Sequence, residues 1–159
     1  MMVVNFFDYV NDSKLKFAVI IAQCNGKWVL CKHKQRDTWE FPGGHREPGE
    51  SIDETARREL REESGAVEFT VTPVCAYSVT GKNRVNKTGE ESFGMLYTAE
   101  IFSFEKDLHS EMERVELFSQ LPDNWTYPEI QPKLLEEYLR RMVLKEPVYA
   151  AIHRQVFLI

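Results

Sequence analysis

Three glutamates, Glu59, Glu62 and Glu63, are spaced so that a helix would bring their carboxylates together. On a helical wheel at about 100° per residue they share one arc, which touches an apolar arc. The apolar arc consists of Ile52, Ala56 and Leu60. This spacing therefore predicts a group of carboxylates beside a buried edge, and not a fully solvated face.

Carboxylates in such a position repel one another, and their arc offers no obvious cationic partner. A merely solvated charged face would lie opposite the apolar arc, where Glu54, Arg57 and Arg61 are placed. Hard divalent cations with oxygen ligands, Mg²⁺ or Mn²⁺, would supply the missing positive charge. Such a metal lowers the pKa of a bound water, and a nearby carboxylate could take its proton, so the pattern predicts attack on phosphorus.

The composition restricts the ligands and partners of the protein. The 159 residues include 20 Lys and Arg against 25 Asp and Glu, which gives a formal charge of −5. A net negative chain is a poor nonspecific ligand for polyanionic DNA, so we expect no binding of duplex DNA. A small phosphate-bearing substrate would need a bound cation between its phosphates and the acidic protein. The 43% apolar content suits a single globular domain over residues 1–159.

The sequence also indicates where the protein works. Residues 1–11 lack the basic start of a secretory signal, and no stretch approaches the roughly 20 apolar residues that cross a bilayer. Cys24, Cys31 and Cys75 are an odd, well-separated set, which is typical of buried reduced thiols. We expect a cytoplasmic protein without a membrane partner.

The elements that must position the glutamates can be predicted along the chain. Residues 16–23 and 27–32 read as two strands joined at Asn25-Gly26, a favoured hairpin turn. A short segment, 38–41, then leads into Pro42-Gly43-Gly44, where we expect a turn that starts a functional loop. Ser51 and Glu54 form a capping box, which predicts a helix over 52–64 that ends at Gly65.

The second half of the chain is predicted to contain two long strands and a helix. Residues 67–80 and 92–104 are rich in β-branched and aromatic side chains, and 115–119 could add a short strand. Helical spacing of apolar residues predicts a second helix, with Leu134, Leu135, Tyr138, Leu139 and Met142 on its packed face. The tail beyond residue 147 is apolar enough to pack.

The glutamates belong to a longer pattern, residues 43–66, which reads GGHREPGESIDETARRELREESGA. This segment resembles the Nudix box, which covers residues 44–66 here. The matching residues are Gly44, Glu50, Arg58, Glu59, Leu60, Glu62, Glu63 and Gly65. Ala66 is small where a larger aliphatic residue is usual. The preceding WEFPGG is similar to the MutT-like branch of the family.

The resemblance implies an α/β Nudix fold, in which a mixed β-sheet is sandwiched between helices. It also implies hydrolysis of a nucleoside diphosphate linked to another moiety. The implied metal ligands are Glu59, Glu62, Glu63 and the Gly43 carbonyl. Glu59 would also act as the catalytic base or orient the water, and Glu50 with Arg58 would brace the loop and the helix.

Further site residues follow from the resemblance and from the basic side chains after the second strand. An additional acidic ligand is expected from Glu111 or Glu113, with Glu111 preferred. Lys32, His33, Lys34 and Arg36 could receive substrate phosphates, against the alternative of an ordinary basic surface. Trp125 and Tyr127 could stack on a base, although core packing is the usual role of such residues.

The substrate that the MutT-like resemblance implies is a (d)NTP or an oxidised purine nucleotide such as 8-oxo-dGTP, cleaved to the monophosphate and pyrophosphate. MutT-like proteins use an Asn near the start of the last helix to prefer oxidised guanine, where this chain has Glu129 or Ile130. Two alternatives stay open: hydrolysis of RNA 5′-triphosphate ends, and a catalytically inactive nucleotide-binding module. Such a module would be expected to lack a metal-binding glutamate, and none is missing here.

Overall fold

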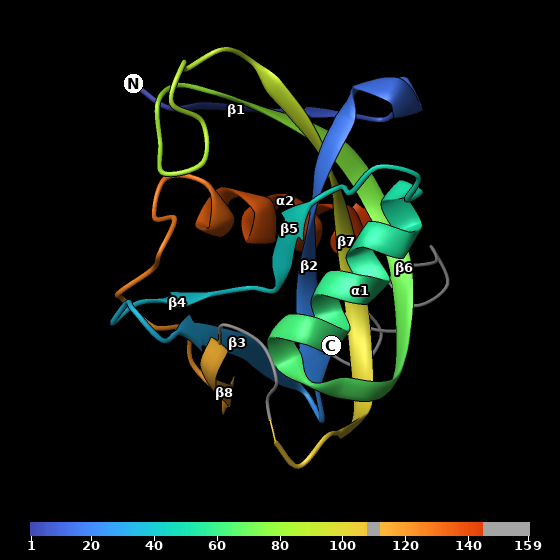
Figure 1. Ribbon diagram of the computed structural model, residues 1–159, viewed down its shortest axis with the longest axis vertical. Helices are drawn as coiled ribbons and strands as arrows, with labels where there is room; N and C mark the ends of the chain where they lie inside the picture. The colour runs from blue at the N-terminus through green and yellow to red at the C-terminus, as the bar shows by residue number, and fades with distance from the viewer. Residues whose placement is uncertain (108–111, 145–159) are drawn as a thin grey trace, which may run out of the picture.

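The computed structural model describes residues 1–107 and 112–144 (Figure 1). Its elements, in chain order, are β1 (Val3–Phe7), the 3-10 helix η1 (Asp12–Lys14), β2 (Leu15–Cys24), β3 (Lys27–His33), β4 (Trp39–Glu40), β5 (Gly43–His45), α1 (Ile52–Ser64), β6 (Ala66–Thr80), β7 (Ser92–Phe104), β8 (Met112–Phe118) and α2 (Gln131–Leu144). No helix in these two stretches is long and apolar enough to cross a membrane.

The strands form a mixed sheet with the order β1-β6-β7-β2-β3-β4. Strand β2 runs parallel to β7, whereas the other neighbours are antiparallel. Two strands lie off this path, because β5 pairs with β2 and β8 pairs with β3. The sheet is therefore mixed, as the sequence predicted.

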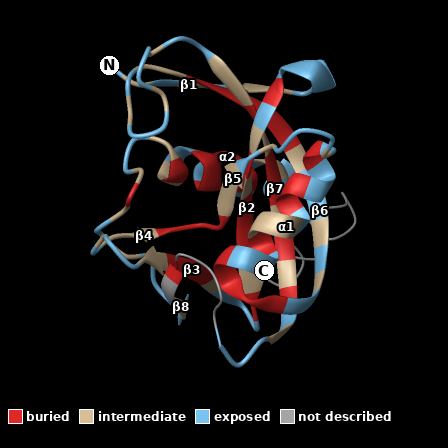
Figure 2. Cartoon of the chain, viewed as in Figure 1, coloured by how far each residue is buried: buried red, intermediate tan, exposed pale blue. Residues whose placement is uncertain are grey.

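The two helices cover opposite faces of the sheet. In the central strand β2, Ile20 packs in a core with Leu60 of α1, while the next residue, Ile21, packs in a second core with Leu134 of α2. Successive side chains of a strand point to opposite faces, so a strand buried on both sides feeds two cores. Figure 2 shows the buried residues along β2 and on the sheet-facing sides of both helices. The predicted sheet between helices is confirmed.

The predicted hairpin is present but short. Asn25 and Gly26 both adopt positive φ angles, 51° and 76°, as this two-residue turn requires. Only the pairs Gln23↔Trp28 and Cys24↔Lys27 join β2 to β3. Strand β3 then diverges to pair with β4 and β8, and this leaves one edge of β2 open to β5.

The predicted turn at residues 42–44 was wrong, and the open edge of β2 explains why. Gly43–His45 is the strand β5, and it pairs with Phe17, Ala18 and Val19 of β2. A Cβ at Gly43 would lie 2.6 Å from the Ala18 carbonyl oxygen, so this close pairing needs glycine. The segment is thus fixed to the sheet at the point where we expected a functional loop to begin.

Most other elements agree with the predicted ranges, but Leu139 and Met142, which were predicted on the packed face of α2, are exposed. Helix α1 and strand β7 have the predicted bounds, β6 starts one residue earlier, and β8 spans 112–118 in place of 115–119. The strand β1, which pairs with β6, was not predicted. The three cysteines are buried and free, as expected. The C-terminal tail from residue 145, and the candidate ligand Glu111, lie outside the described residues.

Candidate active site

Helix α1 holds the glutamates in place because both of its ends are fixed by local hydrogen bonds. The Ser51 side chain accepts a hydrogen bond of 3.1 Å from the Glu54 N–H at the first turn. At the other end Gly65 adopts a left-handed conformation, with φ at 74°, and its N–H bonds to the Arg61 carbonyl. The helix therefore has one register, and Glu59 and Glu63 lie one turn apart on it.

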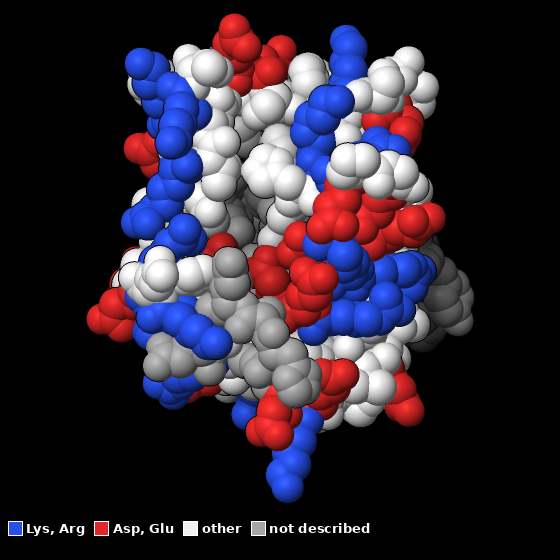
Figure 3. All heavy atoms as spheres, viewed as in Figure 1, with Lys and Arg blue, Asp and Glu red and all other residues white. Residues whose placement is uncertain are grey.

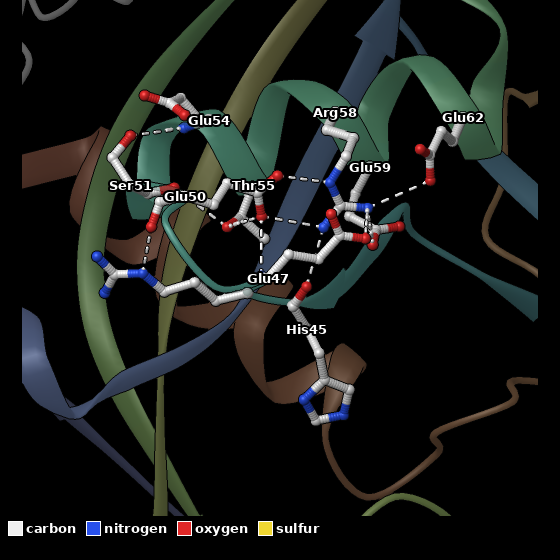
Figure 4. A network of polar contacts seen from close by, with 10 residues as sticks. His45, Glu47, Glu50, Ser51, Glu54, Thr55, Arg58, Glu59 and Glu62 are labelled. Carbon is white, nitrogen blue, oxygen red and sulfur yellow. Dashed lines mark hydrogen bonds and ion pairs between the residues drawn. The ribbon is translucent and has the colours of Figure 1, made fainter.

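Arg58 is the cationic partner that the sequence analysis did not find. Its Nη1 lies 2.8 Å from Glu59 Oε1 and 3.2 Å from Glu62 Oε2 (Figure 4). The expectation that the three glutamates lack a cation on their side of the helix was therefore wrong. The helical wheel places Arg58 outside their arc, but a long guanidinium reaches across to it.

The same guanidinium connects α1 to the loop that precedes it. Its Nε lies 2.6 Å from Glu50 Oε2, and its Nη2 donates to the His45 carbonyl at 3.0 Å. Glu50 also accepts hydrogen bonds from the Thr55 hydroxyl, at 2.7 Å, and from the Glu47 N–H, at 3.1 Å. The hydrogen bond from Arg58 is the main reason why the pKa of Glu50 falls to about 2.

Glu63 is the most buried of the three glutamates, with 9% of its surface exposed. Its Oε1 accepts a long hydrogen bond of 3.4 Å from the Gly43 N–H, and its Oε2 is buried without a hydrogen bond. Burial, and then the neighbouring Glu59, raise the pKa of Glu63 well above its ordinary value. Burial also raises the pKa of Glu59, against the opposing effects of Glu63 and Arg58. Two buried carboxylates thus face each other without full compensation.

These carboxylates suit a divalent cation in their chemistry, although not in their present positions. A buried carboxylate oxygen without a hydrogen bond is costly, and Mg²⁺ and Mn²⁺ bind such oxygens. Within residues 1–107 and 112–144, however, no three His, Cys, Asp or Glu side chains converge closely enough to hold a metal ion. Arg58 holds Glu59 and the more exposed Glu62, and Glu62 would have to turn toward Glu63 for joint coordination.

A cavity of about 490 Å³ lies on the other side of β5 from the glutamates. It is bounded by β2, β5, β6, the loop between β6 and β7, and the start of α2. Gly43 and Gly44 line it, and a Cβ at Gly44 would overlap the Glu59 carboxylate. The two glycines thus separate the glutamates from the cavity with backbone alone.

Charged side chains of both signs surround this cavity, and Lys16 and Arg46 are among its lining residues. Figure 3 shows a hollowed surface with a column of Lys and Arg over the β6–β7 loop on one side. On the other side, basic side chains near the top of β2 lie above a cluster of Asp and Glu over α1 and the segment before it. The basic residues of that loop are Lys82, Arg84 and Lys87. A negatively charged substrate in the hollow would meet positive charge on both sides, and would need cations where it approaches the acidic cluster.

The predicted phosphate-binding residues do not form one group at the cavity. Arg36 is beside it, with Nη1 3.6 Å from Oε1 of the cavity residue Glu40. Lys32 and His33 end strand β3 and are absent from the described lining. Lys34 lines a separate hollow near Phe104 and Arg114. Arg36 thus lies beside the cavity, and the phosphate-binding role of all four residues stays a prediction.

Several cavity residues were missed by the sequence analysis. Glu40, Tyr77 and Gln131 line the cavity, and the Gln131 side chain accepts a hydrogen bond of 2.8 Å from the Phe41 N–H. These residues come from β4, β6 and α2, so no local motif connects them. Of the two aromatics considered for base stacking, Tyr127 lines the cavity, whereas Trp125 packs against Phe41 with ring centroids 5.8 Å apart.

Comparison with known proteins gives the family. The NUDIX domain model matches residues 12–138. The chain belongs to the Nudix family. Strands β2 to β8 and helix α1 all fall inside the matched region of this Nudix protein, as do the first turns of α2.

Individual relatives agree with this membership. The Nudix chain is 35% identical, over 121 residues, to YtkD of Bacillus subtilis, a candidate 8-oxo-dGTP diphosphatase; the match covers 76% of this chain and 72% of YtkD. It is 31% identical to the nucleoside triphosphatase NudI of an Enterobacter species, over 55% of this chain and 68% of NudI. The crystal structure of the B. subtilis pyrophosphohydrolase BsRppH aligns with a TM-score of 0.71 at 27% identity, over 88% and 90% of the two chains. Together these matches make the chain a Nudix pyrophosphohydrolase, which acts on nucleoside diphosphate derivatives.

Proposed function

We propose that this Nudix hydrolase cleaves nucleoside triphosphates, including oxidised purine nucleotides such as 8-oxo-dGTP, to the monophosphate and pyrophosphate with Mg²⁺ or Mn²⁺. One observation carries the proposal: the buried, unpaired Glu63 oxygen lies near Gly43, which also lines a cavity large enough for a small-molecule ligand. A cation site and a base site would thus lie on the two sides of β5. The similarity to YtkD, a candidate 8-oxo-dGTP diphosphatase, and to the nucleoside triphosphatase NudI supports this substrate class.

The proposed metal ligands are Glu59, Glu62, Glu63 and the Gly43 carbonyl. Glu111 stays a proposal from the sequence alone. When bound, the metal would lower the pKa of a water molecule and offset the charge of the phosphates. Glu59 has a raised pKa, which suits a residue that accepts a proton from the attacking water near neutral pH.

Glu50 and Arg58 act in this proposal as positioning residues. Their ion pair at 2.6 Å holds the loop before α1 against the helix, and Arg58 also contacts Glu59 at 2.8 Å. A small displacement of a reacting group can lower a rate by about 100-fold, so this brace is needed for activity. Arg58 also balances the charges of Glu59 and Glu62 in the metal-free protein.

The experiment that tests the proposal is a panel of nucleotides with purified protein. We expect pyrophosphate release from dGTP, 8-oxo-dGTP or other triphosphates with Mg²⁺, and its loss with EDTA. In ¹⁸O-labelled water the label should enter the nucleoside monophosphate. Orthophosphate with a nucleoside diphosphate as main products, or turnover that EDTA does not affect, would contradict the proposal.

The basic side chains of the β6–β7 loop favour a second candidate, RNA with a 5′-triphosphate. Lys82, Arg84 and Lys87 are exposed on this loop, and the phosphates of a longer chain could contact them because Asn83, Val85 and Asn86 of the same loop line the cavity. Triphosphorylated RNA therefore belongs in the panel. A steeper loss of activity with salt for RNA than for dGTP would favour RNA. An inactive binding module would bind nucleotides and release no pyrophosphate.

A further inference from the structure

The carboxylate of Glu40 is held in the wall of the cavity with an unused acceptor. The residue is 7% exposed, and its Oε1 makes no hydrogen bond. Arg36 Nη1 lies 3.6 Å from that oxygen, which balances charge but is too far for a hydrogen bond. Burial raises the pKa of Glu40, against the nearby charges of Arg36 and His33. Because buried polar atoms are normally paired, the unused oxygen points to a ligand that supplies a donor.

The rest of the cavity suits a flat aromatic ligand. Phe17, Phe41, Tyr77 and Tyr127 line it, and its volume of about 490 Å³ is that of a small-molecule site. Aromatic walls accept any base face without distinguishing one base from another. Discrimination must therefore come from polar groups at the edge of the ligand, and an ionised carboxylate accepts hydrogen bonds without donating any.

We propose that Glu40 is a specificity-determining residue, which selects guanine nucleotides by accepting hydrogen bonds from the adjacent ring N–H and amino group of guanine. The inference rests on the proposed function and names the preferred base. Guanine presents two neighbouring donors on this edge. Adenine and cytosine present one donor beside a ring nitrogen acceptor, which a carboxylate would repel.

The same chemistry predicts what Glu40 does not distinguish. Oxidation of guanine at C8 leaves the ring N–H and the amino group of that edge in place. Glu40 therefore selects the guanine ring, oxidised or not. Hypoxanthine keeps the ring N–H but lacks the amino group, so it tests the pair of donors directly.

The test is the binding of dGMP, dIMP and dAMP to metal-free protein, measured by calorimetry. These ligands share one phosphate, so its repulsion by the glutamates affects all three equally. The wild type should bind dGMP about tenfold more tightly than dIMP, and dAMP most weakly. Glu40→Gln should weaken dGMP binding by about 10- to 100-fold, the range for hydrogen bonds to a charged group, and should spare dAMP.

Two further variants complete the design. Glu68→Gln removes an exposed carboxylate from β6, outside the cavity lining, and should leave all three affinities unchanged. Glu40→Asp keeps the charge but withdraws it by one methylene, so it should lose dGMP selectivity in a protein with wild-type unfolding behaviour. Equal weakening of all three ligands by Glu40→Gln, or equal binding by the wild type, would overturn the inference.

Measurements of nucleotide hydrolysis distinguish a failure of this inference from a failure of the proposed function. Hydrolysis of all nucleotides at similar kcat/KM, unchanged in selectivity by Glu40→Gln, would leave the function in place and refute the role of Glu40. Guanine-selective binding without hydrolysis of any nucleotide would support Glu40 and refute the proposed function.

Discussion

At the scale of single residues, the site depends on how one arginine divides its hydrogen bonds. Arg58 contacts Glu50 in the loop and Glu59 and Glu62 on the helix. Both carboxylate oxygens of Glu50 accept hydrogen bonds and its pKa is lowered, whereas the pKa of Glu59 is raised. Two carboxylates that share one cation thus have different environments. The first suits a structural role and the second a role in proton transfer.

The Glu59→Gln variant tests whether Glu59 takes part in proton transfer. The variant keeps the shape of the side chain but removes its charge and its ability to take a proton. We expect kcat to fall by at least about 100-fold, as in the loss of general-base catalysis. Glu54→Gln, an exposed change on the same helix, should retain near wild-type kcat and serves as the control. Near wild-type rates for Glu59→Gln would contradict the assignment.

The lowered pKa of Glu50 predicts how the stability of the fold depends on pH. Its pKa is about 2 in the folded protein against an ordinary value of 4.5, so it stabilises the fold fully above about pH 4.5. This contribution is lost as the pH falls toward 2, because the carboxylate is then protonated. Glu50→Gln should lower Tm at pH 7, and thermal unfolding should show the deficit shrinking between pH 4.5 and 2. A deficit independent of pH would show that the ion pair with Arg58 adds little.

At the scale of elements, α1 is a stable helix that carries a destabilising buried glutamate. Its caps and its apolar face fix it to the sheet, while Glu63 is buried with an unpaired oxygen. Burial of such a group costs free energy that the rest of the helix must offset. Functional sites commonly retain such destabilising groups.

Glu63→Gln should therefore raise the Tm of the metal-free protein, by about 2–4 °C for each kcal/mol relieved. Mg²⁺ should stabilise the wild type more than the variant, because it binds the folded cluster preferentially. Thermal unfolding of both proteins, with EDTA and with millimolar Mg²⁺, measures the two effects. If the metal-free variant melts below the wild type, and Mg²⁺ shifts both equally, Glu63 is satisfied by protein groups and is not a ligand.

At the scale of the whole molecule, the sheet brings two unlike surfaces to one place. The glutamates belong to the α1 side, and the cavity is lined by side chains from the side that α2 covers, such as Tyr77. Strand β5 lies between them at the open edge of β2, and its glycines keep the separation thin. A nucleotide has an aromatic base and an anionic phosphate chain, and this arrangement offers each part a matching surface.

Local patterns determined much of this protein. The caps and the 3.6-residue spacing fixed α1 from Ile52 to Ser64, because they act within a few residues of each other. Asn25 and Gly26 set the hairpin for the same reason. The run from Gly44 to Ala66 was enough to identify the family, later supported by the match over residues 12–138.

Only the tertiary structure decided what lies against these elements. Strand β5 forms because β3 diverges and leaves an edge of β2 open, which no residue of Gly43–His45 encodes alone. The reach of Arg58 depends on where the loop at Glu50 returns. The cavity joins residues as distant as Phe17, Tyr77 and Gln131, and such contacts depend on how layers pack over long sequence separations, which local spacing does not specify.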